Sequence, residues 1–286
     1  MQLTPDIFER YWPLTGVVLG ERLDASTSPR PVGIIHAEEG DYVFKVADQR
    51  SDWRHAMEAL DYLPAHGFTQ VPRLLKTKQS DTYQNLGDDR ICIMEFVDGN
   101  TPSRNAESCA KLGRLMASLH IVEGYPYSAT FIPSEVIEDE LPTLVVDKPF
   151  QEEYLKLVES LPSFEDLPQA VIHTDLSFGN VIERADGELV MIDFDDIGIG
   201  ARVIDLAYPL ILSFVTSDCV YREDNARAFF SAYRSEIELS DHEVELIFPG
   251  ALFFTLMYVI YDDIDANWRR IQWAVANRSL LEKSFQ

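Results

Sequence analysis

The sequence is poor in cysteine and in positive charge, and each shortage excludes a class of protein. Its three cysteines, Cys92, Cys109 and Cys219, include no C-x-x-C pair, so neither a disulfide framework nor a thiolate metal site is expected. Its 24 lysines and arginines are outnumbered by 48 acidic residues, which gives a net charge of -24. Nucleic acids and anionic membranes are bound through basic patches, so neither is expected as a partner.

Long apolar segments are also missing. The longest apolar run, Leu246 to Tyr261, is too short to span a bilayer comfortably and contains Pro249 and Gly250. It predicts a buried helix instead. The first residues lack the charged-then-apolar pattern of a secretory signal, and the cysteine pattern is typical of thiols in a reducing compartment, so a cytoplasmic location is expected.

The patterns that are present change along the chain from strand type to helix type. Short strand-like runs and one helix fill the first third, and amphipathic or apolar helices dominate from about residue 100 onward. The expected strands are 31–40, 40–48 and 90–99, and the expected helices are 51–67, 105–120, 150–161, 202–215, 225–235 and one around Leu246. A strand-rich part therefore joins a mostly helical part near residues 96–99.

One stretch, from Val171 to Asp196, combines many polar residues with apolar runs. Residues 180–183 and 190–194 predict two strands of a hairpin around the turn signal at 185–187. This hairpin places Asn180 at one end and Asp193 at the other. Amide and carboxylate oxygens are ligands of hard cations, so Asn180 and Asp193 are predicted to bind a metal ion. For Asp195 and Asp196, a solvated or loop-capping role is preferred over contact with that site.

These features together indicate phosphoryl transfer. Transfer from ATP depends on positioning and charge neutralisation rather than on covalent chemistry by the protein. Asp175, in "HTDLSFGN", has the place of a carboxylate that orients the incoming hydroxyl. Asn180 and Asp193 would hold the metal ions, and a lysine would hold the phosphates as a point charge.

The segment from His173 to Asn180, followed by Asp193 in "IDFD", resembles the catalytic and metal loops of the aminoglycoside phosphotransferase and choline kinase family. That resemblance implies an α+β, protein-kinase-like fold of two lobes. A nucleotide-binding lobe of residues 1–97 would hold a small mixed sheet, and a larger, mostly helical lobe of residues 98–286 would carry catalysis and substrate binding. It also implies that Asp175 is the catalytic aspartate, that Asn180 and Asp193 hold magnesium, and that Asp205 hydrogen-bonds the catalytic-loop backbone.

The resemblance extends upstream to the nucleotide site. Lys45 resembles the family's phosphate-binding lysine, and Glu58 resembles its ion-pair partner in the next helix. The linker strand that holds adenine through its backbone corresponds to Glu95, Phe96 and Val97. ATP is therefore the expected nucleotide, with GTP as an alternative.

The glycine-rich loop of kinases is absent before Lys45. Its counterpart is the segment from Asp24 to Pro31, in which the hydroxyls of Thr27 and Ser28 and the backbone N–H groups would hold phosphate oxygens. The alternative is that these residues only form a turn.

The predicted function is ATP- and magnesium-dependent phosphorylation of a hydroxyl on a small molecule, aminoglycoside-type or related. A protein substrate is disfavoured because no activation segment ending in A-P-E is present. A homoserine, choline, sugar or macrolide kinase of the same family is the alternative. A non-catalytic nucleotide-binding pseudokinase is disfavoured because Lys45, Asp175, Asn180 and Asp193 are all present.

The acceptor itself is predicted from charge. Asp262, Asp265 and Trp268 are three residues apart in turn, and carboxylates beside an aromatic face suit an ammonium group. The acidic excess would also attract a cationic acceptor, although solubility is the preferred explanation of that excess. The alternative for these three residues is a solvated helix face. The oligomeric state stays open.

Overall fold

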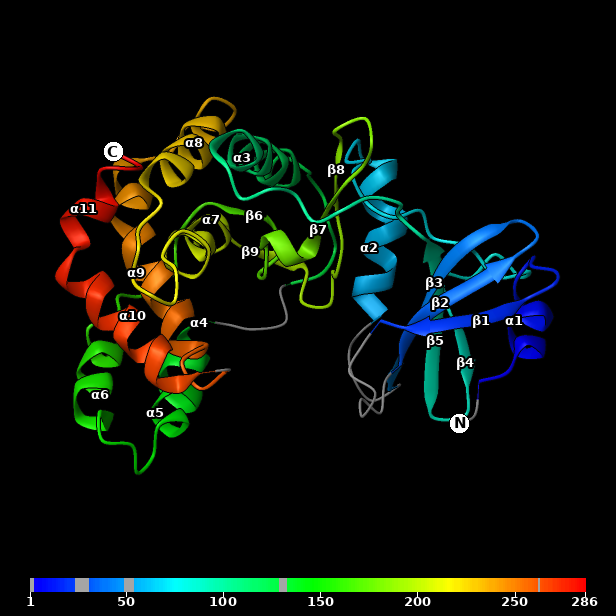
Figure 1. The fold of residues 1–286 in the computed structure, drawn as a ribbon, viewed down its shortest axis with the longest axis horizontal. Helices are drawn as coiled ribbons and strands as arrows, with labels where there is room; N and C mark the ends of the chain where they lie inside the picture. The colour runs from blue at the N-terminus through cyan, green and yellow to red at the C-terminus, as the bar shows by residue number, and fades with distance from the viewer. Residues whose placement is uncertain (1–2, 24–30, 49–53, 129–132, 262) are drawn as a thin grey trace. The chain divides into compact units, whose positions relative to one another are not determined.

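The structure is a computed structural model that describes residues 3–23, 31–48, 54–128, 133–261 and 263–286. The chain groups into two compact units, which Figure 1 shows as a ribbon. We call Met1–Asn100 together with Ile182–Asp195 the sheet unit, and Thr101–Val181 together with Asp196–Gln286 the helical unit.

The sheet unit is built on a five-stranded sheet in the order β1-β2-β3-β5-β4. Every neighbouring pair in it is antiparallel, so the sheet is antiparallel and not mixed as expected. The elements are α1 (Pro5–Tyr11), β1 (Val18–Arg22), β2 (Val32–Ala37), β3 (Gly40–Asp48), α2 (Arg54–Ala65), β4 (Gln84–Leu86) and β5 (Asp89–Glu95). A small hairpin of β7 (Val181–Glu183) and β8 (Leu189–Met191) follows much later in the chain.

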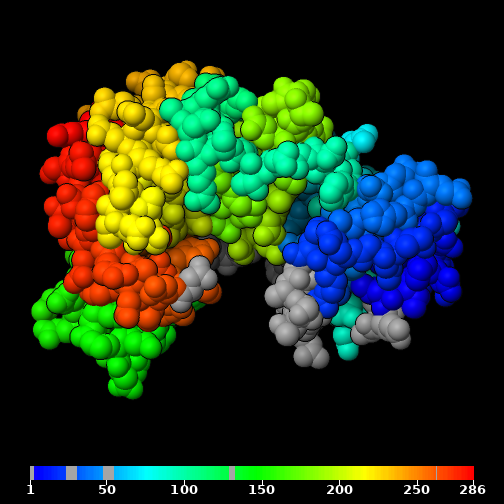
Figure 2. Space-filling view, viewed as in Figure 1, coloured from blue at the N-terminus to red at the C-terminus, as the bar shows by residue number. Residues whose placement is uncertain are grey.

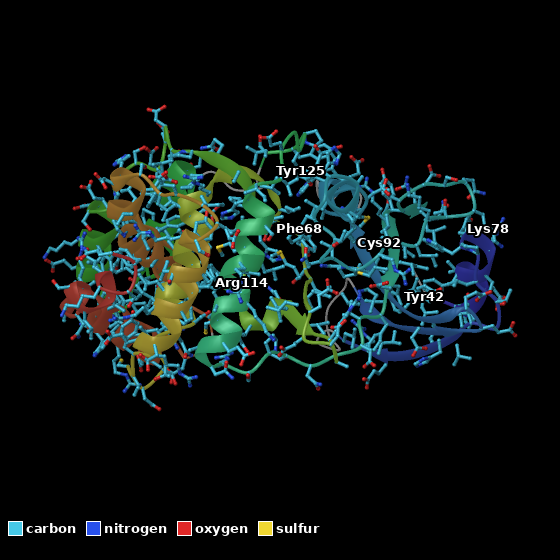
Figure 3. All side chains as sticks on the ribbon, turned by 90° about the horizontal axis from the view of Figure 1, so that it is seen from above. Tyr42, Phe68, Lys78, Cys92, Arg114 and Tyr125 are labelled. Carbon is cyan, nitrogen blue, oxygen red and sulfur yellow. The ribbon has the colours of Figure 1, made fainter. Side chains whose placement is uncertain are left out.

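The alternation of side chains along β3 sorts this unit into two cores. Phe44 and Val46 point to one face, where they pack with Phe8 and Trp12 from the α1 region. Ala47 points to the other face and packs with Met57 of α2. Lys45 lies opposite Cys92, which is labelled in Figure 3 and belongs to this second core. The strand period therefore directs the Lys45 side chain to the α2 face of the sheet.

The helical unit contains most of the helices. Figure 2 shows its visible face, which is formed largely by the segments after residue 200, in yellow to red. The elements are α3 (Ala106–His120), α4 (Pro133–Glu135), a π-turn (Val136–Glu140), α5 (Leu141–Leu144), α6 (Gln151–Glu159), β6 (Gln169–Ile172), a 3-10 turn (Phe178–Asn180), β9 (Gly198–Ala201), α7 (Arg202–Leu212), α8 (Glu223–Arg234), α9 (Asp241–Met257), α10 (Ile264–Ala276) and α11 (Arg278–Glu282).

Close helix packing fixes the centre of the helical unit. Helix α3 packs on α8, and a Cβ at Gly113 would lie only 2.3 Å from the carbonyl oxygen of Phe229. A larger residue than glycine at position 113 would force the two helices apart. Helix α7 packs on α9, and β6 pairs with β9 in a two-stranded antiparallel sheet. Within the part of the chain that is described, no helix is both long and apolar enough to cross a membrane.

Two local predictions need correction. The strand expected over 190–194 ends at Met191, because Asp193 has a left-handed φ of 65° that a strand cannot accommodate. The helix around Leu246 ends at Met257, and α10 is a separate helix that begins at Ile264. Its N-cap is Asp263, whose side chain accepts hydrogen bonds from the next turn.

Candidate active site

Lys45 of β3 forms a compact charge cluster in the sheet unit. Its Nζ donates a hydrogen bond to Asp193 Oδ1 at 2.6 Å and another to a carboxylate oxygen of Asp195. Burial by itself would lower the pKa of Lys45, but the two carboxylates outweigh it and raise the pKa. Lys45 is therefore a fixed ammonium group at neutral pH.

The prediction for Asp195 needs correction. Its carboxylate is a direct ion-pair partner of Lys45 rather than a solvated or loop-capping group. Its carbonyl oxygen also lies 3.3 Å from Nε2 of His55, a buried residue of α2. The backbone on either side of Phe194 thus carries two carboxylates toward one lysine. The sequence shows that Asp193 and Asp195 are two residues apart. The direction of their side chains is decided by the turn that follows β8.

Glu58 is half-buried on α2, the helix that packs on the same face of the sheet as Lys45. The two ion pairs described for Lys45 are with Asp193 and Asp195. The role of Glu58 as an ion-pair partner of Lys45 stays a prediction.

The linker predicted to hold adenine begins at Glu95, the last residue of β5. The N–H of Glu95 donates to the carbonyl of Arg73 at 2.8 Å, and the N–H of Phe96 donates to the carbonyl of Asp41 at 3.1 Å. The N–H of Val97 makes no hydrogen bond to any other residue that the structure describes. Of these three linker amides, the one at Val97 is therefore the donor left for a ligand.

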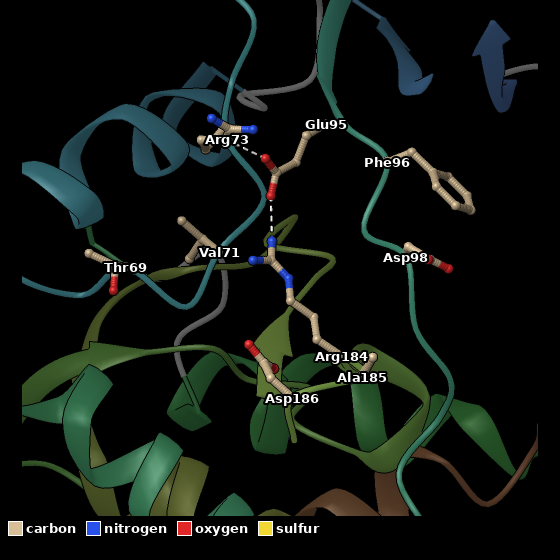
Figure 4. Close-up of a pocket in the computed structure, with 9 residues that line it drawn as sticks. All are labelled: Thr69, Val71, Arg73, Glu95, Phe96, Asp98, Arg184, Ala185 and Asp186. Atoms are coloured by element: carbon tan, nitrogen blue, oxygen red, sulfur yellow. Dashed lines mark hydrogen bonds and ion pairs between the residues drawn. The ribbon is translucent and has the colours of Figure 1, made fainter. Parts of the chain in front are cut away.

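The side chain of Glu95 is used within the protein. Its carboxylate accepts hydrogen bonds from Arg73 and, at 2.6 Å, from Arg184 in the β7–β8 turn. Figure 4 shows this bridge in a polar pocket of about 560 Å³ in the sheet unit. The pocket is lined by Thr69, Val71, Arg73, Glu95, Phe96, Asp98, Arg184, Ala185 and Asp186. The bridge ties the linker to the hairpin whose second strand leads to Asp193.

Asp175 is the centre of a second cluster, in the helical unit. The side-chain nitrogen Nδ2 of Asn180 donates to Asp175 Oδ2 at 3.0 Å and to the backbone carbonyl of Asp175 at 2.8 Å. The hydroxyl of Tyr208 donates to Asp175 Oδ1. Each carboxylate oxygen of Asp175 thus receives at least one donor from the protein.

Asp205 holds the loop that carries Asp175, as the family resemblance implied. Its two carboxylate oxygens accept the N–H groups of His173 at 2.9 Å and Thr174 at 2.7 Å. Thr174 has a left-handed φ of 72°, which typically costs about 1–3 kcal/mol for a residue other than glycine. The two charge-assisted hydrogen bonds stabilise this unfavourable backbone conformation.

His120, at the end of α3, completes this network and was not singled out from the sequence. Its Nε2 lies 3.1 Å from Asp205 Oδ2, and its Nδ1 lies 2.8 Å from the hydroxyl of Tyr233. Burial would raise the pKa of Asp205, but His120 and the loop amides outweigh it and lower the pKa. Asp205 therefore stays ionised although it is fully buried.

The two predicted metal ligands belong to different units, Asn180 to the helical unit and Asp193 to the sheet unit. Among the described ranges of the chain, no three His, Cys, Asp or Glu side chains form a group that could hold a metal ion. Asparagine is not among these four residue types, so this finding does not concern the predicted pair of Asn180 and Asp193. A joint role of Asn180 and Asp193 stays a prediction.

The predicted acceptor site is only partly described. Asp262, like Thr27 and Ser28 of the phosphate loop, lies outside the described residues. Asp265 is exposed on α10, whereas Trp268 is only 7% exposed. The Trp268 ring stacks on Phe150, with centroids 4.5 Å apart and an angle of 12°. One face of this ring therefore packs in the protein core instead of standing open beside Asp265.

Comparisons with known proteins show the family and the fold of the chain. The model of the phosphotransferase enzyme family matches residues 21–239. A curated relative, the homoserine kinase of Bradyrhizobium sp. (strain ORS 278), is 26% identical over 75% of this chain and 70% of its own.

Solved structures share the fold. The choline kinase LicA from Streptococcus pneumoniae has a TM-score of 0.66 at 18% identity, covering 92% of this chain and 94% of that one. An aminoglycoside phosphotransferase from Alicyclobacillus acidocaldarius has a TM-score of 0.65 at 15% identity, covering 100% and 95%. These matches confirm the predicted protein-kinase-like fold, with a small sheet part and a larger helical part. The chain belongs to the phosphotransferase enzyme family and is a kinase that acts on a hydroxyl group of a small molecule.

Proposed function

We propose that the enzyme transfers the γ-phosphoryl group of ATP to the side-chain hydroxyl of homoserine or of a closely similar amino alcohol. The observation that carries the proposal is the cluster at Asp175, a carboxylate oriented by Tyr208 and Asn180 on a backbone held by Asp205. The choice of homoserine is supported by curated relatives of that name, which align with about three-quarters or more of this chain.

In this proposal Asp175 receives the acceptor hydroxyl. Tyr208 and Asn180 donate to different oxygens of the Asp175 carboxylate, which holds this group in one orientation. The incoming alcohol would donate its hydrogen bond to this oriented carboxylate. The carboxylate orients the hydroxyl for attack and takes its proton as the new O–P bond forms, while the bond between the γ-phosphorus and the bridging oxygen breaks and ADP leaves.

Lys45 neutralises phosphate charge in the same proposal. Its ammonium group is fixed between Asp193 and Asp195, which limits the rotamer freedom of a long side chain. The Val97 amide would donate to the adenine ring. Both groups act by positioning and by electrostatic stabilisation, which contribute most in phosphoryl transfer.

We also propose magnesium as the metal ion of the enzyme, because each of the two predicted ligands offers an oxygen atom. Asn180 donates its Nδ2 to Asp175, which leaves its Oδ1 as an acceptor for a cation. Lys45 compensates one of the two negative charges of Asp193 and Asp195, so a further cation would be stabilised there. Asn180 and Asp193 would hold the ion, which when bound neutralises charge on the transferring phosphates.

A panel of acceptors tests the proposal. Purified enzyme is incubated with ATP, magnesium and, separately, homoserine, choline, a neutral sugar, a macrolide and an aminoglycoside, and ADP formation and phosphorylated product are measured. We expect homoserine to give the highest kcat/KM and the Asp175→Ala variant to lose about 10²- to 10⁴-fold in kcat. If an aminoglycoside or choline gave the highest kcat/KM, that compound would replace homoserine as the proposed acceptor. Full activity of Asp175→Ala would overturn the role of Asp175.

A cationic acceptor is the second candidate, and the exposure of Asp265 supports it. An exposed carboxylate attracts an ammonium group over a distance that salt shortens to about 8 Å at physiological ionic strength. The same panel therefore includes a salt series. A KM for choline or an aminoglycoside that rises steeply with salt is the expected result for this candidate, and a salt-independent KM contradicts it.

A further inference from the structure

We infer that Tyr208 is a positioning residue for phosphoryl transfer, which fixes the plane of the Asp175 carboxylate through the hydrogen bond from its hydroxyl. This inference rests on the proposed function, because it concerns how Asp175 receives the acceptor. Four features of the helical unit carry it.

The first feature is the pair of donors on Asp175. Asn180 donates to Oδ2 and Tyr208 donates to Oδ1, so both ends of the carboxylate are held. The χ2 torsion of aspartate is broad, and a single donor would leave the carboxylate free to rotate about it. Two donors on opposite oxygens define the plane, and with it the direction of the remaining lone pairs.

The second feature is the position of Tyr208 on α7. Asp205 and Tyr208 are three residues apart, so they lie on the same face of the helix. Asp205 holds the backbone of His173 and Thr174, and Tyr208 holds the side chain of the next residue, Asp175. One rigid helix thus fixes both the loop and its functional group.

The third feature is the packing of the Tyr208 ring. The residue is 6% exposed, and its ring meets Phe254 of α9 edge-on, with centroids 5.0 Å apart. It meets the ring of Tyr258 in the same way at 6.1 Å. Because these neighbours restrict the ring, the hydroxyl is held at Asp175 by the core rather than by the hydrogen bond alone.

The fourth feature is the state of the two tyrosine hydroxyls. Burial, with the charge of Asp175, raises the pKa of Tyr208, and burial raises the pKa of Tyr258 to about 12. Both hydroxyls therefore stay protonated near neutral pH.

The test compares two tyrosine-to-phenylalanine variants. Tyr208→Phe removes the hydroxyl that contacts Asp175. Tyr154→Phe removes another buried hydroxyl of the helical unit, which donates to the carbonyl of Leu256 at 3.1 Å. Both keep the ring and its packing, so a purely structural effect should appear equally in both. The measurements are Tm, kcat and the KM for ATP, with the best acceptor of the panel.

We expect Tyr208→Phe to lower kcat by about 10- to 100-fold, because small misplacements of a reacting group cost rate of this order. The KM for ATP should stay within about twofold, since no ground-state contact to nucleotide is removed. Transfer to the acceptor should fall more than the slow hydrolysis of ATP by water, because water needs no fixed acceptor geometry. Tyr154→Phe should keep kcat.

The outcomes separate this inference from the proposed function. An active wild type whose kcat is unchanged by Tyr208→Phe overturns the inference alone. Equal losses of kcat in Tyr208→Phe and Tyr154→Phe also overturn it, because they indicate a general effect of buried hydroxyls. A wild type that transfers phosphate to no alcohol overturns the proposed function and this inference with it.

Discussion

The imidazole of His120 lies 3.1 Å from the carboxylate of Asp205, and both side chains are fully buried. This contact links the end of α3 to α7, and Asp205 in turn holds the left-handed backbone at Thr174. A carboxylate at such a position is stable only while its hydrogen-bond partners remain, because an unpaired buried charge is costly. The loop that carries Asp175 therefore depends on a residue more than fifty positions earlier in the chain.

We expect His120→Ala to lower the free energy of unfolding by about 3 kcal/mol, since it leaves buried Asp205 with fewer partners. Urea denaturation followed by circular dichroism measures the change. His242→Ala is the matched control, because His242 is 65% exposed on α9 and its removal should cost less than about 0.5 kcal/mol. Equal costs for the two variants would contradict the role given to His120.

Lys45→Ala should lower kcat/KM for ATP by about 10²-fold or more, because it removes the ammonium group that we propose neutralises phosphate charge. It also leaves Asp193 and Asp195 together without their shared cation. The control is Lys76→Ala in the same unit, whose partner Asp61 is about half exposed and which should change kcat/KM little. Steady-state kinetics with varied ATP measures both. Comparable losses would mean that the wrong lysine was chosen.

The metal prediction is tested by titrating activity with magnesium. Asn180→Ala and Asp193→Asn should each raise the magnesium concentration for half-maximal activity by about tenfold or more, because each removes an oxygen ligand or its charge. Asn225→Ala, in the helical unit, and Asp186→Asn, in the sheet unit, are matched controls that should leave it unchanged. A magnesium requirement that none of the four variants alters would remove Asn180 and Asp193 from the metal site.

The fold could be predicted largely from local patterns. The apolar alternation and the Gly-Asp turn predicted β3 at residues 40–48, where the structure has it, and helical spacing predicted α3 within one residue. The order of His173, Asp175, Asn180 and Asp193 was sufficient to indicate a kinase. These features are encoded by neighbours in the chain, so a single sequence reveals them.

Contacts between distant segments could not be predicted in this way. A solvated or loop-capping role was predicted for Asp195, because nothing near it in the sequence shows that it forms an ion pair with Lys45. Trp268 was placed beside exposed carboxylates because the spacing alone does not show that Phe150 covers one face of its ring. Tyr208 could have been noticed from its position three residues after Asp205. Its contact with Asp175 depends on the packing of α7 against α9.

The position of α7 depends on a charge pair at the start of two helices, and this pair makes stability depend on pH. Arg202, the first residue of α7, donates to Glu243 Oε1 at 2.6 Å and to its Oε2 at 2.9 Å. The Glu243 side chain is 1% exposed and also closes the capping box of α9 with Ser240. Burial would raise the pKa of Glu243, but the hydrogen bonds from Arg202 and Ser240 outweigh it and lower the pKa from 4.5.

Arg202→Ala should therefore lower the free energy of unfolding by about 3 kcal/mol near neutral pH, since a buried carboxylate loses its partner. An acid whose folded pKa is lowered stabilises the protein above its unfolded pKa, and this contribution disappears as pH falls through the folded pKa. In the variant the carboxyl can take up a proton, so the difference from wild type should shrink as pH falls below 4.5. Urea denaturation at about pH 7 and about pH 4 measures both values.

Arg227→Ala, which breaks an exposed pair with Glu223, should cost less than about 0.5 kcal/mol at either pH. A loss for Arg202→Ala that is the same at both pH values would show that Arg202 stabilises α7 through packing and not through the charge of Glu243.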